Sequence, residues 1–175
     1  TRFEADLDMR MNQSNQLSAY HVVNEYSQED LRDVLLQYGE LRAAPAMARV
    51  IVETRVNGEI KTSEQLKSAL KKFLSPKHEN KILAQIYQAI RIEVNQEIEA
   101  LKEFLQQTPE VLKSGGRLSL ISYHSLEDRL VKRFMRNGLF EGEPERDVFG
   151  RFEVPFKKVG KLIVPTAQEI KENNR

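Results

Sequence analysis

The chain contains no cysteine and no long hydrophobic run. Without cysteine, a disulfide framework and metal sites built from thiolates are excluded. The three histidines, His21, His78 and His124, lack the spacing of paired metal ligands, so we expect no metal site. Even the longest apolar stretches, such as residues 50–52 and 162–164, are far too short to cross a bilayer, and no signal peptide opens the chain. These absences predict a cytoplasmic protein without a membrane partner.

An excess of charge of one sign is also missing, since 27 basic residues face 26 acidic ones and the net charge is +1. Domains that bind nucleic acid by neutralising phosphates are usually strongly basic overall. Any RNA-binding surface must therefore be local. Charged residues make up 30% of the chain and hydrophobic residues 40%, which is typical of a globular protein. The 175 residues suffice for one domain, or for a small domain and part of another.

A helical pattern extends from Ser18 to about Thr108, where apolar residues recur at three- and four-residue spacing. Helix start signals precede these stripes. Two are capping pairs, Ser27 with Asp30 and Thr62 with Gln65, and the third is Pro45. The longest stripe predicts one long helix with a limit or kink at Pro109; its apolar residues are Ile82, Ile86, Ile90, Val94, Ile98, Leu101 and Leu105.

The pattern changes after Gly116. Residues 117–122 form a short segment that is rich in aliphatic side chains, which predicts a buried strand. Ser125 and Asp128 then predict the N-cap and third residue of a helix. Residues 138–160 predict mainly loop, residues 161–164 a second strand, and residues 166–169 the capping box of a final helix. Two strands do not make a stable sheet, so a partner, a second copy or further residues must complete it, and a homodimer is one hypothesis.

The densest group of residues that carry chemistry is 122–129, at the end of the first predicted strand and the start of the following helix. Open α/β sheets bind ligands at this place. The free amides of the helix start favour anions, His124 exchanges protons near neutral pH, and Asp128 with Arg129 fits a charge pair or a phosphate. The alternative is that Ser125 and Asp128 cap the helix while His124 satisfies backbone groups. Spacing alone favours that alternative, because capping boxes are common.

Asp8 and Arg10 form a second compact group between apolar residues. The alternative to a functional role is a surface ion pair at a structural junction, which contributes little to stability.

Two polar rows on predicted helices are less specific. One is basic and fits an RNA backbone, although a solvated helix face explains it equally well; it comprises Arg129, Lys132, Arg133 and Arg136. The other could face a groove or only frame a core; it comprises Tyr87, Arg91 and Asn95.

Five motifs, taken together in their order and spacing, are more specific than any one of them. They are residues 7–11, 38–40, 88–97, 115–118 and 122–132. In these motifs the chain resembles the RsmH family, formerly called MraW, of bacterial ribosomal RNA methyltransferases. The resemblance covers essentially the whole chain. Two small departures are Tyr123, where the family usually has Phe, and Leu41, where a second Glu is common.

The resemblance implies N4-methylation of one cytidine in the decoding region of 16S rRNA, with S-adenosylmethionine as the methyl donor. It also implies a fold class of mixed α and α/β, mainly helical, in which an inserted helical domain interrupts a Rossmann-like methyltransferase domain. Residues 1–11 would be the junction, residues 12–110 the inserted helical domain, and residues 111–175 the C-terminal remnant of the methyltransferase domain. The family's donor-binding segments would precede Thr1, so no donor-binding residue is expected in this chain and a fragment of this kind would be inactive alone.

Together with the placement of the loop at a strand end, the resemblance implies site residues. Catalytic roles are expected for His124, Ser125 and Asp128. Substrate-binding roles are expected for Asp8, Arg10, Arg129, Lys132 and Arg133. The expected partner is 16S rRNA in the small ribosomal subunit. The alternative function is a helical RNA- or protein-binding module without catalytic activity.

Overall fold

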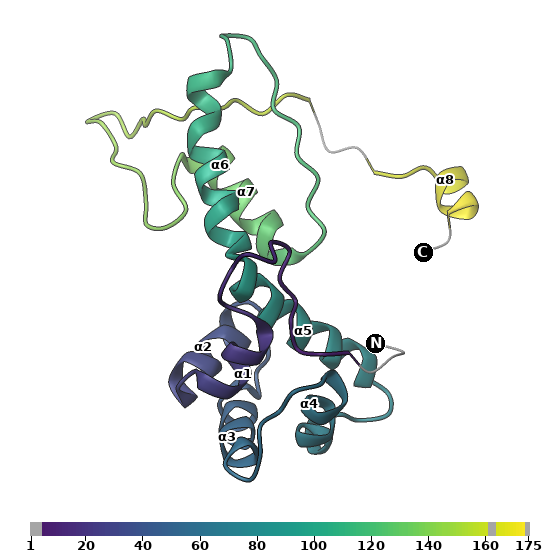
Figure 1. The fold of residues 1–175 in the computed structure, drawn as a ribbon. Helices are drawn as coiled ribbons and strands as arrows, with labels where there is room; N and C mark the ends of the chain where they lie inside the picture. The colour runs from purple at the N-terminus through teal and green to yellow at the C-terminus, as the bar shows by residue number, and fades with distance from the viewer. Residues whose placement is uncertain (1–4, 161–163, 174–175) are drawn as a thin grey trace. The chain divides into compact units, whose positions relative to one another are not determined.

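The computed structural model describes residues 5–160 and 164–173, which form two compact units that divide between residues 101 and 102. Both units are helical where their backbone is regular (Figure 1). Within the described ranges no helix is both long and apolar enough to cross a membrane. The prediction of a mainly helical chain is confirmed.

The first unit is built from short helices joined by tight turns. These are α1 (Ala19–Glu25), α2 (Gln28–Gln37), α3 (Ala44–Arg55), α4 (Ser63–Ala69), the 3-10 helix η1 (Lys71–Phe73), α5 (Glu79–Asn95) and the start of α6 (Glu97–Val111). The predicted start signals are confirmed: Ser27 Oγ accepts the Asp30 N–H at 3.1 Å, and Thr62 and Gln65 form a capping box. Pro45 lies in the first turn of α3, where its missing N–H costs no hydrogen bond.

The core of the first unit lies where α2 packs against α3 and α5, and where α1 packs against α3 and α5. Its largest fully buried side chains come from several helices and from the turn before α4, and include Leu31, Leu35, Met47, Ile51, Ile60, Leu66 and Ile86. Arg55 supports this packing from the side, because its guanidinium donates to the carbonyls of Val23 and Tyr26 at the end of α1. The apolar stripes of the sequence therefore became the inward faces of the helices.

Gly39 fits a close approach between α2 and α5. A Cβ at this position would lie 2.7 Å from the Leu35 carbonyl oxygen and 3.1 Å from the Gln85 carbonyl oxygen. Gln85 Nε2 donates to the Gly39 carbonyl at 3.0 Å, and Gln88 Nε2 to the Tyr38 carbonyl at 3.4 Å. The turn after α2 is thus fixed to α5 by backbone contact that only glycine permits.

The prediction of a single long helix from Ile82 to Leu105 is wrong. Gln96 adopts a left-handed conformation, with φ of 50° and ψ of 41°, and it divides the stretch into α5 and α6. The apolar stripe continues on both sides of this residue, so periodicity alone does not reveal the break. Pro109 lies inside α6, which ends at Val111.

The second unit contains the rest of α6 together with α7 (Ser125–Asn137) and α8 (Ala167–Glu172). Phe134 of α7 is buried, and its ring stacks on Phe140 at 4.9 Å between centroids and lies 6.3 Å from Phe156. Gly138 ends α7 in a left-handed conformation, and its N–H donates to the Phe134 carbonyl at 2.8 Å. The predicted capping box of Thr166 and Glu169 at the start of α8 is confirmed.

The strand predicted at residues 117–122 is not formed in the part of the chain that the structure describes. Its backbone is irregular and pairs with no neighbour there, although half-buried Leu118 and Leu120 still alternate with exposed Ser119 and Ile121. A strand exists only where a second segment takes its backbone hydrogen bonds. The second predicted strand, residues 161–164, falls mainly outside the described residues.

Candidate functional site

The segment that leads to Asp8 is built into the first unit. The Leu7 N–H donates to the Lys61 carbonyl at 2.9 Å, and the Ser63 N–H donates to the Ala5 carbonyl at 2.8 Å. The carbonyls of Leu7 and Asp8 then accept two N–H groups of the first turn of α1, those of Tyr20 at 2.6 Å and Ala19 at 2.7 Å. These contacts fix the backbone on which Asp8 stands.

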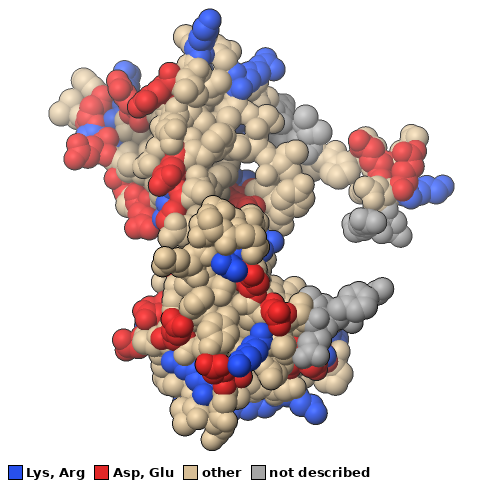
Figure 2. Space-filling view, viewed as in Figure 1, with Lys and Arg blue, Asp and Glu red and all other residues tan. Residues whose placement is uncertain are grey.

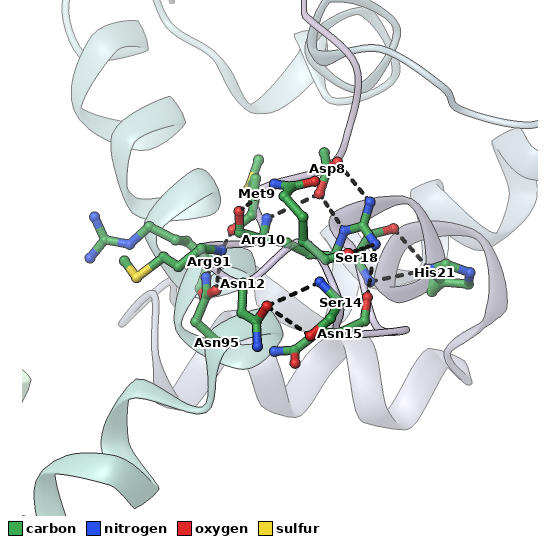
Figure 3. A network of polar contacts seen from close by, with 12 residues as sticks. Asp8, Met9, Arg10, Asn12, Ser14, Asn15, Ser18, His21, Arg91 and Asn95 are labelled. Carbon is green, nitrogen blue, oxygen red and sulfur yellow. Dashed lines mark hydrogen bonds and ion pairs between the residues drawn. The ribbon is translucent and has the colours of Figure 1, made fainter.

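Asp8 and Arg10 form a two-pronged ion pair (Figure 3). Arg10 Nε donates to Asp8 Oδ1 at 2.7 Å, and Arg10 Nη2 donates to Asp8 Oδ2 at 3.0 Å. The backbone N–H of Arg10 adds a third bond to Asp8 Oδ1 at 3.1 Å. These hydrogen bonds from Arg10 lower the pKa of the Asp8 carboxyl and raise that of the Arg10 guanidinium. The structure thus brings these two predicted residues together.

The same guanidinium organises the loop that follows. Arg10 Nη1 donates to the carbonyls of Gln13 at 3.1 Å and Asn15 at 2.8 Å, and Gln13 Nε2 returns a bond to the Arg10 carbonyl at 3.0 Å. Ser14 donates to Asn12 through both its N–H and its hydroxyl. Residues 11–16 are all exposed and carry no charged side chain. The role of Arg10 in the structure is therefore to hold the conformation of this exposed loop.

Asn95, at the end of α5, anchors the other side of the loop. Its Nδ2 donates to the Met9 carbonyl at 2.9 Å, and its Oδ1 accepts the Met11 N–H at 2.8 Å (Figure 3). Met9 has a φ of 59°, an uncommon conformation for a residue with a side chain, and these two bonds bracket it. Of the predicted polar row, Tyr87 donates its hydroxyl to the Ser63 carbonyl at 3.1 Å, and Arg91 pairs with Glu97 at 2.8 Å. The row serves to hold the first unit together.

The start of α7 differs by one residue from the prediction. His124, and not Ser125, is the N-cap: its backbone is extended and its Nδ1 accepts the Glu127 N–H at 3.4 Å. The imidazole replaces the hydroxyl that usually takes this bond. Ser125 is the first helical residue and is exposed.

Glu127 is the residue that sequence analysis missed. Its Oε2 accepts the Tyr123 N–H at 3.0 Å, and its Oε1 lies 3.2 Å from His124 Nε2. Because Nδ1 accepts a hydrogen bond, the proton of a neutral ring sits on Nε2, which is buried and makes no hydrogen bond with the described residues although this carboxylate lies nearby. A Glu three residues after His124 is the signal that would have found it, had histidine been considered as a cap.

The other predicted residues of α7 lie along its first three turns. Lys132 Nζ donates to Asp128 Oδ2 at 2.7 Å, an exposed pair one turn apart. Arg133 turns away from the solvated face, because its Nη2 donates to the Gly142 carbonyl at 2.6 Å. Arg129 is exposed beyond the first turn. The basic row thus divides into residues that face solvent and one that shapes the loop after α7.

The model of the MraW methylase family matches residues 2–175. The chain belongs to this family. It is 67% identical to the ribosomal RNA small subunit methyltransferase H of Flavobacterium johnsoniae, over 100% of the chain and 58% of that protein. The corresponding proteins of Christiangramia forsetii and Cytophaga hutchinsonii are 66% and 48% identical, over 100% and 99% of the chain and 58% of each protein. The chain therefore spans somewhat more than half the length of these relatives.

Three of the motifs that suggested the MraW family meet in the first unit. Asn95, in the motif of residues 88–97, holds the carbonyl of Met9 and the N–H of Met11. Gln88 of the same motif donates to Tyr38, in the motif of residues 38–40. These motifs are therefore parts of one packed arrangement, in which α5 carries the groups that fix the two others.

Two surface hollows lie in the described part of the first unit. One surface hollow, of about 420 Å³, is lined by two tyrosines and three acids, namely Tyr26, Tyr38, Asp30, Asp33 and Glu93, with Val34 and Gln37. There the Tyr26 hydroxyl donates to Glu93 at 2.7 Å, and burial together with this carboxylate raises the Tyr26 pKa. The other hollow, of about 280 Å³, lies beside Leu7 and Tyr20. The three acids that line the first hollow would repel the carboxylate of a methyl donor.

Proposed function

We propose that the protein to which this chain belongs methylates N4 of a cytidine in the decoding region of 16S rRNA, with S-adenosylmethionine as donor. The observation that carries the proposal is the MraW family match over residues 2–175, together with relatives named as small-subunit ribosomal RNA methyltransferases. The chain covers 58% of those relatives, so the activity is proposed for the whole protein and not for these residues alone. The donor would be held by another part of the protein. The substrate would be the small ribosomal subunit in the cytoplasm.

The chemistry requires positioning more than acid–base strength. The lone pair of the cytosine amino group is delocalised into the ring, which makes it a weak nucleophile. The enzyme must therefore unstack the base, hold its amino nitrogen in line with the donor methyl, and accept a proton as the new bond forms. Residues that fix a rigid loop beside the base contribute directly to this positioning.

His124, Ser125 and Asp128 are proposed to act at the target base from the start of α7. His124 caps the helix start through Nδ1, and its buried Nε2 lies 3.2 Å from Glu127 Oε1 without a hydrogen bond. Ser125 is exposed in the first turn of α7, and the contact assigned to it is one with a substrate amino group. Asp128 orients the turn through its bond to Lys132.

The five substrate-binding residues are proposed to act in two ways. Asp8 and Arg10, which are engaged with each other, shape the exposed loop of residues 11–16, and that loop would meet the RNA. Arg129 and Lys132 are exposed on α7 and suit phosphate contact, whereas Arg133 shapes the loop at Gly142.

Two variants of His124 in the whole protein test the catalytic assignment. His124→Ala removes both the cap and the ring, whereas His124→Asn keeps a capping oxygen without the ring. If His124 acts at the base, both variants should lower methyl transfer to small subunits by about 100-fold or more. Near-normal activity of His124→Ala would overturn the assignment. If His124→Asn retained full methyl transfer, the role of His124 would be only that of a helix cap.

The second candidate is a helical RNA-binding module without catalysis. The observation that favours it is that the first unit has its own buried core and keeps Asp8, Arg10 and Asn95 in contacts within the unit. Gel shifts of this chain with 16S rRNA test the module, and methyl transfer by the whole protein tests the enzyme. Salt-sensitive RNA binding by the chain, with no methyl transfer by the whole protein, supports the module; the absence of RNA binding excludes it.

A further inference from the structure

An ordered turn in the second unit, residues 146–151, has no part in the roles proposed above. Asp147 Oδ1 accepts the N–H groups of Phe149 at 2.9 Å and Arg151 at 2.7 Å. The Asp147 N–H donates to the Arg151 carbonyl at 2.8 Å, and the Gly150 N–H donates to the Asp147 carbonyl at 2.9 Å. Gly150 has a φ of 77°, which glycine adopts without strain. These four hydrogen bonds fix the turn from within.

The turn presents two adjacent apolar side chains to solvent. Val148 is 94% exposed and Phe149 is 80% exposed. Scattered exposed apolar residues are ordinary on a protein surface, but a valine and a phenylalanine side by side on an internally fixed turn form a projecting apolar tip. Burying such a tip against a partner removes apolar surface from water and so favours binding. Its fixed shape reduces the conformational entropy that is lost on binding.

The two arginines beside the tip stabilise the turn. The Arg151 guanidinium lies 5.9 Å from the centre of the Phe149 ring, and the Arg146 guanidinium lies 5.0 Å from the centre of the Phe152 ring. Arg146 Nη1 also donates to the Gly150 carbonyl at 3.1 Å. Both cations are therefore held against the turn by rings and a carbonyl.

The surroundings of the tip are acidic. Residues 139–153 contain five acidic and two basic side chains, which gives a net charge of −3. The glutamates at 141, 143, 145 and 153 are all exposed. Figure 2 shows acidic side chains gathered over the loop that follows α7, with few basic ones among them. A phosphate backbone would be repelled here, whereas a basic surface would be attracted.

We infer that the tip of Val148 and Phe149 docks into an apolar pocket with a basic rim on a protein component of the particle that carries the substrate RNA. The inference rests on the proposed function, which supplies that particle. The apolar tip would provide the affinity, and the surrounding glutamates would provide the selection for a basic partner.

Binding of the fluorescently labelled chain to small ribosomal subunits and to protein-free 16S rRNA tests the inference. Phe149→Ala should weaken binding to subunits about tenfold and leave binding to protein-free rRNA unchanged. Val148→Ala should weaken subunit binding about threefold. The matched control is Val56→Ala, because Val56 is also 80% exposed but lies in the first unit, and it should change neither affinity.

Two further variants separate a protein partner from RNA. Glu145→Lys should weaken binding to subunits if the rim is basic, and should strengthen it if the tip meets phosphates. Asp147→Ala removes the carboxylate that fixes the turn and should weaken subunit binding several-fold, with the helical circular dichroism unchanged.

The outcomes separate the inference from the proposed function. Unchanged subunit binding by Phe149→Ala, an equal loss on protein-free rRNA, or a gain for Glu145→Lys would each overturn the inference while the proposed function stands. If the wild-type chain bound neither subunits nor rRNA, the proposed partner of the whole protein would lose its support, and this inference would fall with it.

Discussion

The two units treat their apolar side chains in different ways. Among the described residues of the first unit most large apolar side chains are buried, and those exposed include Met11, Leu36 and Val56. In the second unit Leu105 and Phe134 are buried, but many others are exposed, including Val111, Ile121, Tyr123, Val148, Phe149 and Val159. The first unit therefore has a core sufficient for its own stability, whereas the second leaves apolar surface for further contacts.

The polar site residues differ in the same way. In the first unit Asp8 and Arg10 bond within residues 8–15, but Asn95 of α5 bonds to the Met9 carbonyl and the Met11 N–H from more than 80 residues away, so the order of the loop depends on the folded core. In the second unit the contacts of His124 and Asp128 span three or four residues within one helix. We therefore expect the second set to survive loss of tertiary structure better than the first.

The largest effect is expected from truncating the core of the first unit. Ile51 is fully buried in α3, and Ile51→Ala should lower the free energy of unfolding by about 2–5 kcal/mol. The matched change in the second unit, Ile121→Ala, removes a side chain that is 85% exposed and should cost less than about 0.5 kcal/mol. Urea unfolding followed by circular dichroism measures both. Similar losses in the two variants would contradict the contrast between the units.

A smaller effect is expected from the aromatic cluster of the second unit. Phe134→Ala removes the ring that stacks on Phe140 and approaches Phe156. The loss should be about 2–3 kcal/mol, below the usual range for a core phenylalanine, because the two partner rings are only half-buried. Amide hydrogen exchange should show faster exchange at Gly138 and unchanged protection at core residues such as Ile51. Equal loss of protection in both units would show that they unfold together.

The close contact at Gly39 gives a third test within the first unit. In Gly39→Ala the new Cβ would lie 2.7 Å from the Leu35 carbonyl oxygen, and neither that backbone nor α5 can move without cost. We expect a loss of about 1–3 kcal/mol in urea unfolding. The amide resonances of Gln85 and Gln88, whose side chains bind this turn, should shift. An unchanged unfolding midpoint would show that α2 and α5 have room to separate.

Sequence predicted the helices of the first unit well because their signals are local. Ser27 and Thr62 accept the bonds that their spacing predicted, as Thr166 does in the second unit, and the apolar stripes of the first unit face the core. The break at Gln96 was not predictable in this way, since neither glycine nor proline marks the left-handed residue. The His124 cap was displaced by one residue because a serine with an acid three residues later offered the commoner pattern.

The predicted strand at 117–122 failed for a different reason. The exposure of its side chains still alternates, with Leu118 and Leu120 half-buried. A strand, however, also needs a neighbouring segment that takes its backbone hydrogen bonds. Contacts such as those of Arg10 with Gln13 and Asn15 were equally beyond the sequence, because they depend on how the loop closes. Site residues could thus be found by type and motif, but their partners required the fold.

The smallest expected effect is the pH dependence of the Asp8–Arg10 pair. The hydrogen bond from Arg10 lowers the Asp8 pKa in the folded state, so the pair contributes stability at pH values above the ordinary pKa of 3.8. That contribution is lost as the pH falls from 3.8 through the lowered folded-state value. Because the Asp8 side chain is 42% exposed, solvent screens the pair and the contribution should be about 0.5 kcal/mol or less.

Asp8→Asn measures this small contribution of the Asp8–Arg10 ion pair to stability. The variant should lose stability at pH 6, and its deficit relative to the wild type should shrink as the pH falls through the lowered pKa of Asp8 and the wild-type carboxyl also becomes neutral. Asp128→Asn is the matched control in the second unit, since it weakens the exposed contact to Lys132 within one helix and leaves the loop of residues 11–16 untouched. If Asp8→Asn also increased the exchange of the Met11 amide while Asp128→Asn did not, the ion pair would be shown to hold the loop. An unaltered Met11 amide would assign the loop's order to Asn95 alone, and Arg10 would then be the better candidate for direct RNA contact.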